Sequence, residues 1–424
     1  GCEEYEEGVV YEVLRPLYGI PSSARALHIT LDKWFRSKGF ESVGFEDSVW
    51  SREAGGEYGS RIVVSAHIDD CLMACGDEQV LQQFKADFLA RFDGTDEGEV
   101  QQYLGCDITR DRVNRTATIS QRVYAERVLR AYDMWDCSTV KTPLEPGARL
   151  SKRDCPQHVD PALHRRYRGI VGHISFLVSV TRPDMAFAYS ELSKFVQYPG
   201  VTHLRAAERV LQYLRGTHDR GLTYYDLGED RRNVLEGWVD SDFAADPDTR
   251  RSVTGYVMSL NGAPVSWKSK RQSCVTLSSS EAEFVAASMC GQEVIYLRAI
   301  LEGMGHRQQG ATKVWEDNAS CILMAQNPVN RERSRHIDTR VFFIRDLVKL
   351  KIVELVKCAG VNNVSDALTK SLPYPAMHKH SEYLWGSRVP FSAFWARVPG
   401  WRRVAVFATV VKTIPCPWRA PLRP

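Results

Sequence analysis

Four acidic residues spaced along residues 235–372 constrain this chain more than any other feature of its sequence. Asp240 ends an apolar run, Glu283 lies in a long segment with helical spacing, Asp317 follows a short apolar run, and Asp366 lies in a last short helical segment. The ends of strands and the first turns of helices are positions where side chains from distant parts of a chain converge. The pattern therefore predicts a domain in which alternating strands and helices bring carboxylates together.

The elements around these acids are expected in the order strand, strand, strand, helix, strand, helix, helix, strand, helix. The strand segments are short, rich in β-branched and aromatic residues, and bounded by Gly, Pro or Asp. A change to three- and four-residue spacing marks the long helix, whose start fits a capping box of Ser280 and Glu283. The expected fold class is α/β (α+β) with a mixed five-stranded sheet. Its strands are expected at residues 234–239, 255–260, 264–268, 313–315 and 353–357.

A buried group of carboxylates implies a particular chemistry. Like charges gathered in one place repel, and one carboxyl of such a group normally stays protonated. Two divalent cations would remove that cost and could hold the attacking and leaving oxygens of a phosphoryl displacement. Mg²⁺ suits this role because it prefers oxygen ligands and keeps water molecules.

Each acid also has a purely structural interpretation. Asp240 could be a turn former, Glu283 the glutamate of the capping box, and Asp317 or Asn318 an N-cap. Asp366 could be a solvated helix residue.

Seven ordered sequence blocks decide between these interpretations. They are residues 238–244, 252–256, 265–272, 277–284, 317–318, 335–338 and 366–370. Together they resemble the ribonuclease H domain of Pol polyproteins from copia-type retrotransposons. The resemblance implies that Asp240, Glu283, Asp317 and Asp366 hold two Mg²⁺ or Mn²⁺ ions, and that the domain cleaves the RNA strand of an RNA–DNA hybrid.

The pair Asp69–Asp70 lies between two apolar segments that are expected to be strands, residues 61–68 and 71–76. A tight turn is the ordinary interpretation of such a pair. However, residues 67–70 resemble the YVDD motif of copia-type reverse transcriptases, with His67 in place of tyrosine. Residues 17–25, 103–105 and 120–124 resemble other segments of the same enzymes. The resemblance implies that Asp69 and Asp70 are metal-binding carboxylates of a polymerase palm. The first palm carboxylate and the fingers are expected upstream, so this chain is expected not to extend a primer.

Basic residues near the expected metal site are candidates for contacts with the hybrid. They are Lys268, Lys270, Arg271, Arg333, Arg335, His336 and Arg340. The arginines of the helical region at residues 140–230, with Tyr167 and Tyr213, fit equally well a surface that binds a nucleic-acid backbone and an ordinary solvated helix face.

Four domains are expected from the resemblance. They are the remainder of a reverse transcriptase, with palm and thumb, at residues 1–145; a helical connection at 146–230; a ribonuclease H-like domain at 231–372; and a basic, Pro-rich tail at 373–424. The apolar run at residues 404–411 has no neighbouring element to pack on. The tail is therefore expected to be poorly ordered.

Composition excludes several other classes. The chain of 424 residues is 44% apolar and 25% charged, as in an ordinary globular protein, and its net charge of +3 does not by itself indicate a nucleic-acid-binding protein. The eleven scattered cysteines fit neither a zinc site nor a secreted disulfide framework. No signal peptide and no apolar run of membrane-spanning length is expected.

These observations predict an intracellular protein, in a cytoplasmic particle or the nucleus, that contacts RNA–DNA hybrid and template–primer but no membrane. The first residue is not Met, which we interpret as a start inside a longer reading frame. Two alternatives to a ribonuclease H stay open at this point. The chain could be a nucleic-acid-binding remnant with decayed catalytic sites, or the product of a pseudogene.

Overall fold

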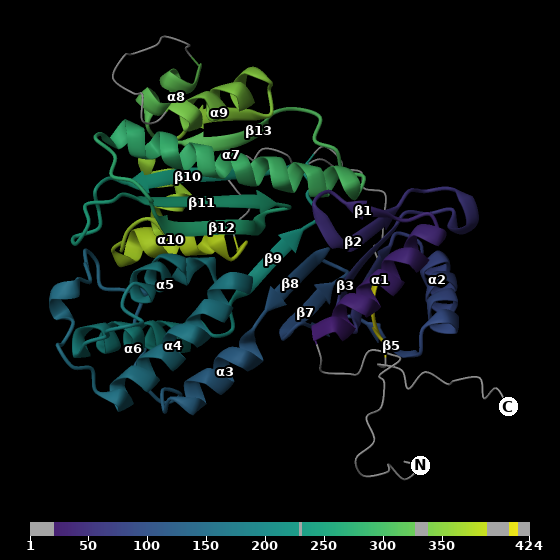
Figure 1. Ribbon diagram of the computed structural model, residues 1–424, viewed down its shortest axis with the longest axis horizontal. Coiled ribbons are helices and arrows are strands. Elements are labelled where there is room, and N and C mark those ends of the chain that lie inside the picture. The colour runs from purple at the N-terminus through teal and green to yellow at the C-terminus, as the bar shows by residue number, and fades with distance from the viewer. Residues whose placement is uncertain (1–20, 229–230, 327–337, 388–406, 414–424) are drawn as a thin grey trace, which may run out of the picture. The chain divides into compact units, whose positions relative to one another are not determined.

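The computed structural model of the chain describes residues 21–228, 231–326, 338–387 and 407–413. The chain packs as two compact units. Among the described residues, the first is formed by residues 21–100, 302–305 and 407–413, and the second by those from 101 to 387 other than 302–305. Three sheets, one of them mixed and five-stranded, confirm the predicted α/β (α+β) class (Figure 1). The domain boundaries at residues 145, 230 and 372 stay predictions.

The first unit contains an antiparallel six-stranded sheet in the order β1-β2-β3-β4-β15-β5. An aromatic core packs between this sheet and its helices, and Phe35, Trp50 and Phe84 in it are fully buried. Leu27, Leu31, Trp34 and Phe35 lie at helical spacing on the first helix and face this core. The elements are α1 (Pro21–Ser37), β1 (Glu41–Val43), β2 (Glu46–Arg52), β3 (Ile62–His67), β4 (Asp70–Cys75), α2 (Glu78–Arg91), β5 (Gly94–Glu99) and β15 (Phe407–Thr413).

The predicted hairpin around the Asp-Asp pair is present, but its turn is one residue earlier than expected. His67 pairs with Asp70 across β3 and β4, so the two turn residues are Ile68 and Asp69. Ile68 adopts a φ of 55°, the left-handed conformation that such short turns require. Asp70 is therefore the first residue of β4 rather than part of the turn.

The expectation of a poorly ordered tail at residues 373–424 is wrong for two segments. Residues Tyr374–Leu384 form helix α10. Residues 407–413 form β15, which pairs antiparallel with β4 on one side and β5 on the other. Val410 and Val411 are buried, and Val411 belongs to the aromatic core. The neighbouring strands could not be identified from the sequence because they lie at the other end of the chain.

The second unit begins with a four-stranded sheet, β6-β7-β8-β9, and a group of helices. Tyr167 and Tyr213 are buried in this helical core, which removes them from any nucleic-acid surface. The elements are β6 (Gln102–Tyr103), β7 (Cys106–Asp111), β8 (Thr116–Ser120), α3 (Arg122–Ala131), α4 (Pro161–Val180), α5 (Ala186–Ser193), α6 (Val201–Gly216) and β9 (Gly221–Tyr225).

The five-stranded sheet of the second unit has the order β12-β11-β10-β13-β14. Its first three strands are antiparallel, whereas β10, β13 and β14 run parallel. The predicted order of elements is confirmed, although the last helical segment is a 3₁₀ helix, η5 (Val364–Leu368). The other elements are β10 (Glu236–Asp242), β11 (Val253–Leu260), β12 (Ala263–Arg271), α7 (Ser279–Gly303), β13 (Thr312–Glu316), α8 (Ala319–Gln326), α9 (Asp338–Lys349), β14 (Val353–Lys357) and α10 (Tyr374–Leu384).

Both faces of this sheet are covered by other elements. Successive side chains of a strand point to opposite faces, so the apolar residues of the central strands are buried on both sides. Val239, Tyr256 and Met258 pack in one core cluster with α7, which crosses the sheet in Figure 1. Trp238 and Val257 point to the opposite face and pack with η5, α10 and the helical core. Two buried faces explain why these strands are apolar nearly throughout.

The long helix α7 corrects one expectation about membranes. It is the one helix in the described part of the chain that is long and apolar enough to cross a membrane by length and composition. Half of its most apolar window is buried inside the protein, where it packs on the sheet. The prediction that no apolar run reaches membrane-spanning length was therefore wrong by these two measures, because a central core helix satisfies them as well.

Gly255 lets η5 lie directly on the sheet. It sits on β11 opposite Asp240 of β10. A Cβ atom on Gly255 would lie 2.7 Å from Thr369 Cγ2, 2.9 Å from Leu368 Cβ and 3.0 Å from the Ser365 carbonyl oxygen. Only a residue without a side chain leaves room for η5 and the residues that follow it.

We expect Gly255→Ala to destabilise the chain by about 1–3 kcal/mol, the usual cost of overpacking a dense core. The melting temperature should fall, and η5 should lose amide protection first in hydrogen-exchange measurements. Gly172→Ala is the matched control, since a Cβ there meets nothing within 4 Å and α4 gains a better helix former. Equal melting temperatures for the two variants would contradict the packing argument.

Candidate metal centre

Three of the predicted acids meet at one end of the five-stranded sheet. Asp240 lies on β10, Glu283 in the second turn of α7, and Asp317 directly after β13. One carboxylate oxygen from each lies within 4.8 Å of the others, and both Asp240 and Glu283 are buried. This is the one such group of three or more potential ligands in the described residues.

The structural interpretation of Glu283 does not hold. The cap of α7 lies two residues earlier than predicted. The backbone amide of Glu281 donates a hydrogen bond to Ser278 Oγ, and the backbone amide of Leu277 donates one to Glu281 Oε2 at 2.7 Å. Glu281 therefore takes the capping role and leaves Glu283 to face the other acids. Its Oε2 atom is buried and has no hydrogen-bond partner among the described residues.

Asp317 is likewise free of a capping role. The N-cap of α8 is Asn318, whose side-chain oxygen accepts the Cys321 amide at 3.1 Å. The backbone amide of Asn318 is in turn bound by Glu316 Oε1 at 2.8 Å. The Asp317 carboxylate is half-buried and lies close enough to Gly360 that a Cβ there would approach its Oδ2 to 2.9 Å.

Residues around η5 hold Asp240 in place. Asn363, fully buried, donates from Nδ2 to the Val239 carbonyl at 2.9 Å and so ties η5 to β10. The Thr369 hydroxyl donates to Asp240 Oδ2. The orientation of Asp240 thus depends on a segment more than a hundred residues away in sequence.

Asp366, the fourth predicted acid, is linked to this group through Lys370. The Lys370 ammonium lies 2.9 Å from Asp366 Oδ1 and 3.7 Å from Asp240 Oδ2. Burial opposes the charge of Lys370, but Asp240 and Asp366 more than offset this effect and raise its pKa. Lys370 therefore supplies positive charge beside two of the four acids.

Burial and mutual repulsion raise the pKa values of these acids. Burial followed by the charge of Glu316 raises the pKa of Glu283 to about 10. Burial followed by the charge of Asp240 raises the pKa of Asp317, and the same two causes raise the pKa of Asp366 to about 7. The carboxylates thus lack the positive charge that would let all of them ionise together.

Glu316, which was not among the predicted acids, is fully buried beside this group. Burial is the largest cause that raises its pKa, to about 8. A signal was present in the alternation along β13, because Thr312, Val314 and Glu316 all point to the same buried side. Lys370 was another missed contact, although it follows Asp366 by four residues, a spacing that favours ion pairs in helical segments.

The other two predicted acids, Asp69 and Asp70, lie in the first unit. Both are half-buried at the tip of the β3–β4 hairpin, beside the exposed His67. No third acid of the described residues joins them to form a group of three ligands. Strand β15 runs along the other edge of β4, and on that edge Asp70 is paired with Lys412.

Three of the predicted basic residues lie on β12, but they do not all point to the same side of the strand. Lys268 and Lys270 are exposed and alternate with Trp267, so they share one side of this edge strand. Arg271 lies on the other side and forms a 3.0 Å ion pair with the buried Asp246. Arg333, Arg335 and His336 lie outside the described residues, and Arg340 belongs to α9 without a described side chain.

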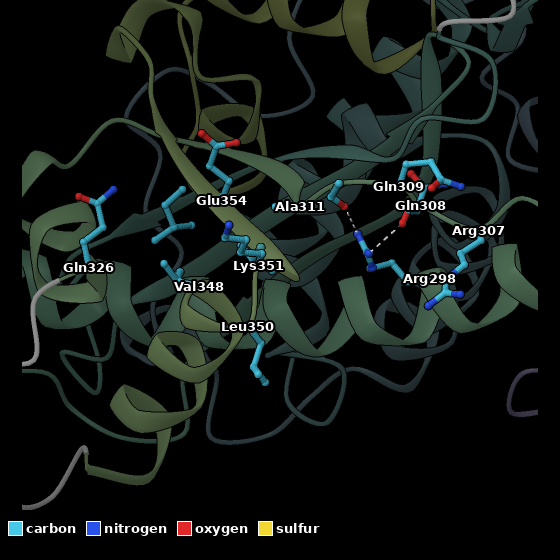
Figure 2. Close-up of a pocket in the computed structure, with 13 residues that line it drawn as sticks. Arg298, Arg307, Gln308, Gln309, Ala311, Gln326, Val348, Leu350, Lys351 and Glu354 are labelled. Carbon is cyan, nitrogen blue, oxygen red and sulfur yellow. Dashed lines mark hydrogen bonds between the residues drawn. The ribbon is translucent and has the colours of Figure 1, made fainter.

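A cavity in the second unit lies away from the carboxylates. It has a volume of about 620 Å³ and is lined by residues such as Arg298, Lys351 and Val353 (Figure 2). Val353 pairs with Thr312 at the start of β13, whereas Asp317 follows the end of that strand, roughly 15 Å away at the usual rise per residue. Arg298 is already engaged by the carbonyls of Gly310 and Gln308.

Comparisons with known proteins relate the chain to retrotransposon polyproteins. A family model described as reverse transcriptase (RNA-dependent DNA polymerase) matches residues 1–146. The Pol polyprotein of transposon TNT 1-94 from Nicotiana tabacum is 33% identical over 86% of this chain and 27% of its own length. The Pol polyprotein of transposon RE1 from Arabidopsis thaliana is 30% identical over 90% of this chain and 25% of its own length. Among solved structures, LC11-RNase H1 isolated from compost has 15% identity and a TM-score of 0.26, over 35% of this chain and 97% of that one.

The site therefore lies at one end of a mixed five-stranded sheet, in a chain whose residues 1–146 match a reverse transcriptase family. The chain is a relative of the Pol polyproteins of copia-type retrotransposons, as the sequence blocks predicted. It spans about a quarter of the length of the curated relatives it matches.

Without added cations, the protein should lose stability as the pH rises. The folded-state pKa values of the acids lie above their ordinary values of 4.5 for Glu and 3.8 for Asp. The stability from these protonated acids is complete below the ordinary values. It is lost as the pH passes about 7 for Asp366, about 8 for Glu316 and about 10 for Glu283. We expect the melting temperature to fall by several degrees across this range, since about 1 kcal/mol corresponds to roughly 2–4 °C in a domain of this size.

Two comparisons check the cause. Glu283→Gln should flatten the fall, because the amide cannot ionise. Mg²⁺ should also flatten it, because an ion bound only by the folded state stabilises that state. A melting temperature that does not change with pH in the unsubstituted, cation-free chain would contradict the proposed repulsion.

Proposed function

We propose that the acid cluster binds divalent cations and that the ribonuclease H-like domain hydrolyses the RNA strand of RNA–DNA hybrids. The observation that carries this proposal is the convergence of Asp240, Glu283 and Asp317, with ligand atoms within 4.8 Å of one another. These acids come from a strand, a helix and a strand end, and neither Glu283 nor Asp317 has a capping role.

The donor set fits a hard divalent cation. All candidate ligands are carboxylate oxygens, the type that Mg²⁺ and Mn²⁺ prefer. The buried Oε2 of Glu283 has no hydrogen-bond partner in the described part of the chain. A bound cation could be coordinated by this oxygen. When bound, two such ions supply an activated water and stabilise the leaving oxygen of a phosphodiester.

The residues around the ions would have separate tasks. Asp240, Glu283, Asp317 and Asp366 would hold the ions. Thr369 donates a hydrogen bond to Asp240 Oδ2 and so fixes the orientation of this carboxylate. Lys370 balances part of the charge on Asp240 and Asp366, and its ammonium would compete with a cation held by these acids.

For the polymerase part, the same reasoning gives a different proposal. Asp69 and Asp70 have no third acid grouped with them in the described residues, whereas the phosphoryl chemistry of two ions requires bridging carboxylates. We expect no templated incorporation of nucleotides on a primed RNA. Incorporation above that of an Asp69→Asn/Asp70→Asn variant would contradict this expectation.

Asp240→Asn in the full chain should lower the rate of hybrid cleavage by more than about 100-fold, because misplaced ions lose the alignment of the reacting atoms. The rate is measured with a labelled RNA strand annealed to DNA in the presence of Mg²⁺. Asp346→Asn is the matched control, since Asp346 is exposed on α9 and away from the acid cluster.

The fold of Asp240→Asn should persist, and its cation-free melting temperature should not fall, because one repelling charge is gone. An unsubstituted chain that binds hybrid but does not cleave it would instead support a decayed remnant. Full cleavage activity in Asp240→Asn would exclude the acid cluster as the catalytic site.

Hybrid binding should weaken steeply with salt, because each phosphate contact releases counterions. Lys268→Gln/Lys270→Gln should reduce the slope of log affinity against log salt by roughly 1–2. Arg271→Gln should lower stability but leave the slope unchanged, since Arg271 is paired with Asp246. If the double variant keeps the original slope, these lysines do not contact phosphates.

A further inference from the structure

The connection from β4 to β5 leaves an opening in the sheet of the first unit. Strand β15 runs antiparallel to both β4 and β5, so β4 and β5 are parallel to each other. Helix α2 is the crossover that joins them. Because β15 lies between them, β4 and β5 are two strand spacings apart, about 10 Å, too far for direct hydrogen bonds.

The strand that fills this opening comes from the far end of the chain. It makes six residue pairs with β4, from Phe407 opposite Cys75 to Lys412 opposite Asp70. It makes four more with β5, at the opposite edge. Strand β15 is the only strand that pairs with β5 in the described part of the chain, and Figure 1 shows it in yellow beside β5.

Strand β5 is also held from outside the sheet. The ammonium of Lys85 on α2, itself almost completely buried, lies 2.5 Å from Asp96 Oδ2 on β5. If β5 moved away, Lys85 would be left as a buried charge without this partner, which is costly. The ion pair therefore ties β5 to α2 by a contact that does not involve β15.

The opening also selects for the side chains of its occupant. Val410 and Val411 are adjacent, so they point to opposite faces of the sheet, yet they are only 3% and 0% exposed. A strand that fits must therefore carry small apolar residues at two successive positions. Its backbone must offer hydrogen bonds on both edges.

We propose that the opening between β4 and β5 is a strand-binding site, and that its ligand is the chain's own segment Phe407–Thr413. The segment behaves as a separable ligand, so the same peptide supplied as a separate molecule takes its place. The recognition chemistry is backbone pairing on two edges combined with burial of two valines.

The first experiment compares Val411→Asp with Val113→Asp in the full chain by hydrogen exchange. A buried aspartate at residue 411 should expel β15, so that amides of Gly94–Glu99 and the β15-facing amides of Asp70–Cys75 lose protection. The pairing of β2 with β3 does not involve β15 and should keep its protection. Val113 is 90% exposed, and the same substitution there should change none of these amides.

The second experiment adds a capped peptide of residues 407–413 to the Val411→Asp chain. Protection of β5 should return as the peptide concentration rises, whereas a peptide that itself carries Val411→Asp should restore nothing. Unchanged exchange of β5 in the variant chain would overturn the proposal. So would a failure of the peptide to restore protection while β2 and β3 stay protected.

If Val411→Asp unfolds the whole unit, Val411→Ala provides the test. It removes apolar contacts without adding a charge, and its loss of protection should be confined to β4 and β5 and be reversed by the peptide. A uniform loss over all strands would contradict a separable ligand. None of these measurements depends on hybrid cleavage, so the outcome is independent of the function proposed for the acid cluster.

Discussion

Repulsion between buried carboxylates at one end of the five-stranded sheet is the constraint on which the functional part of this structure depends. Asp240, Glu283 and Asp317 lie within ligand distance of one another, and Glu316 is fully buried beside them. Without cations the protein tolerates this arrangement in two ways. Protons stay on some of the acids, and Lys370 brings an ammonium to Asp240 and Asp366.

The residues around the acids keep the acid side chains free to face one another. Glu281 and Asn318 take the caps of α7 and α8, so Glu283 and Asp317 are not used for capping. Gly255 leaves the space in which η5 and Thr369 reach Asp240. An apolar cluster of the same size would be more stable than this buried group of acids, and the cost fits the cation site proposed above.

The sheet of the first unit shows a different dependence on distant sequence. A β-α-β crossover that skips one position cannot complete its own sheet, and β15 supplies the missing strand. Unpaired strand edges are prone to associate with other chains, so an occupant of this opening also protects β4 and β5 from such pairing.

The sequence by itself determined the types and order of the elements in the five-stranded sheet, the β3–β4 hairpin and the identity of the acids that meet. Periodicity and strand-end positions are local properties, and they reveal burial directly. Only the tertiary structure decided three things: which residues cap the helices, which basic side chain lies beside the acids, and where residues 407–413 lie. A capping box two residues earlier fits the sequence equally well, and so the assignment to Ser278 and Glu281 required coordinates. The roles of Lys370 and β15 depend on contacts between segments far apart in the chain, and no local pattern specifies which distant partner a charge or a strand edge will find.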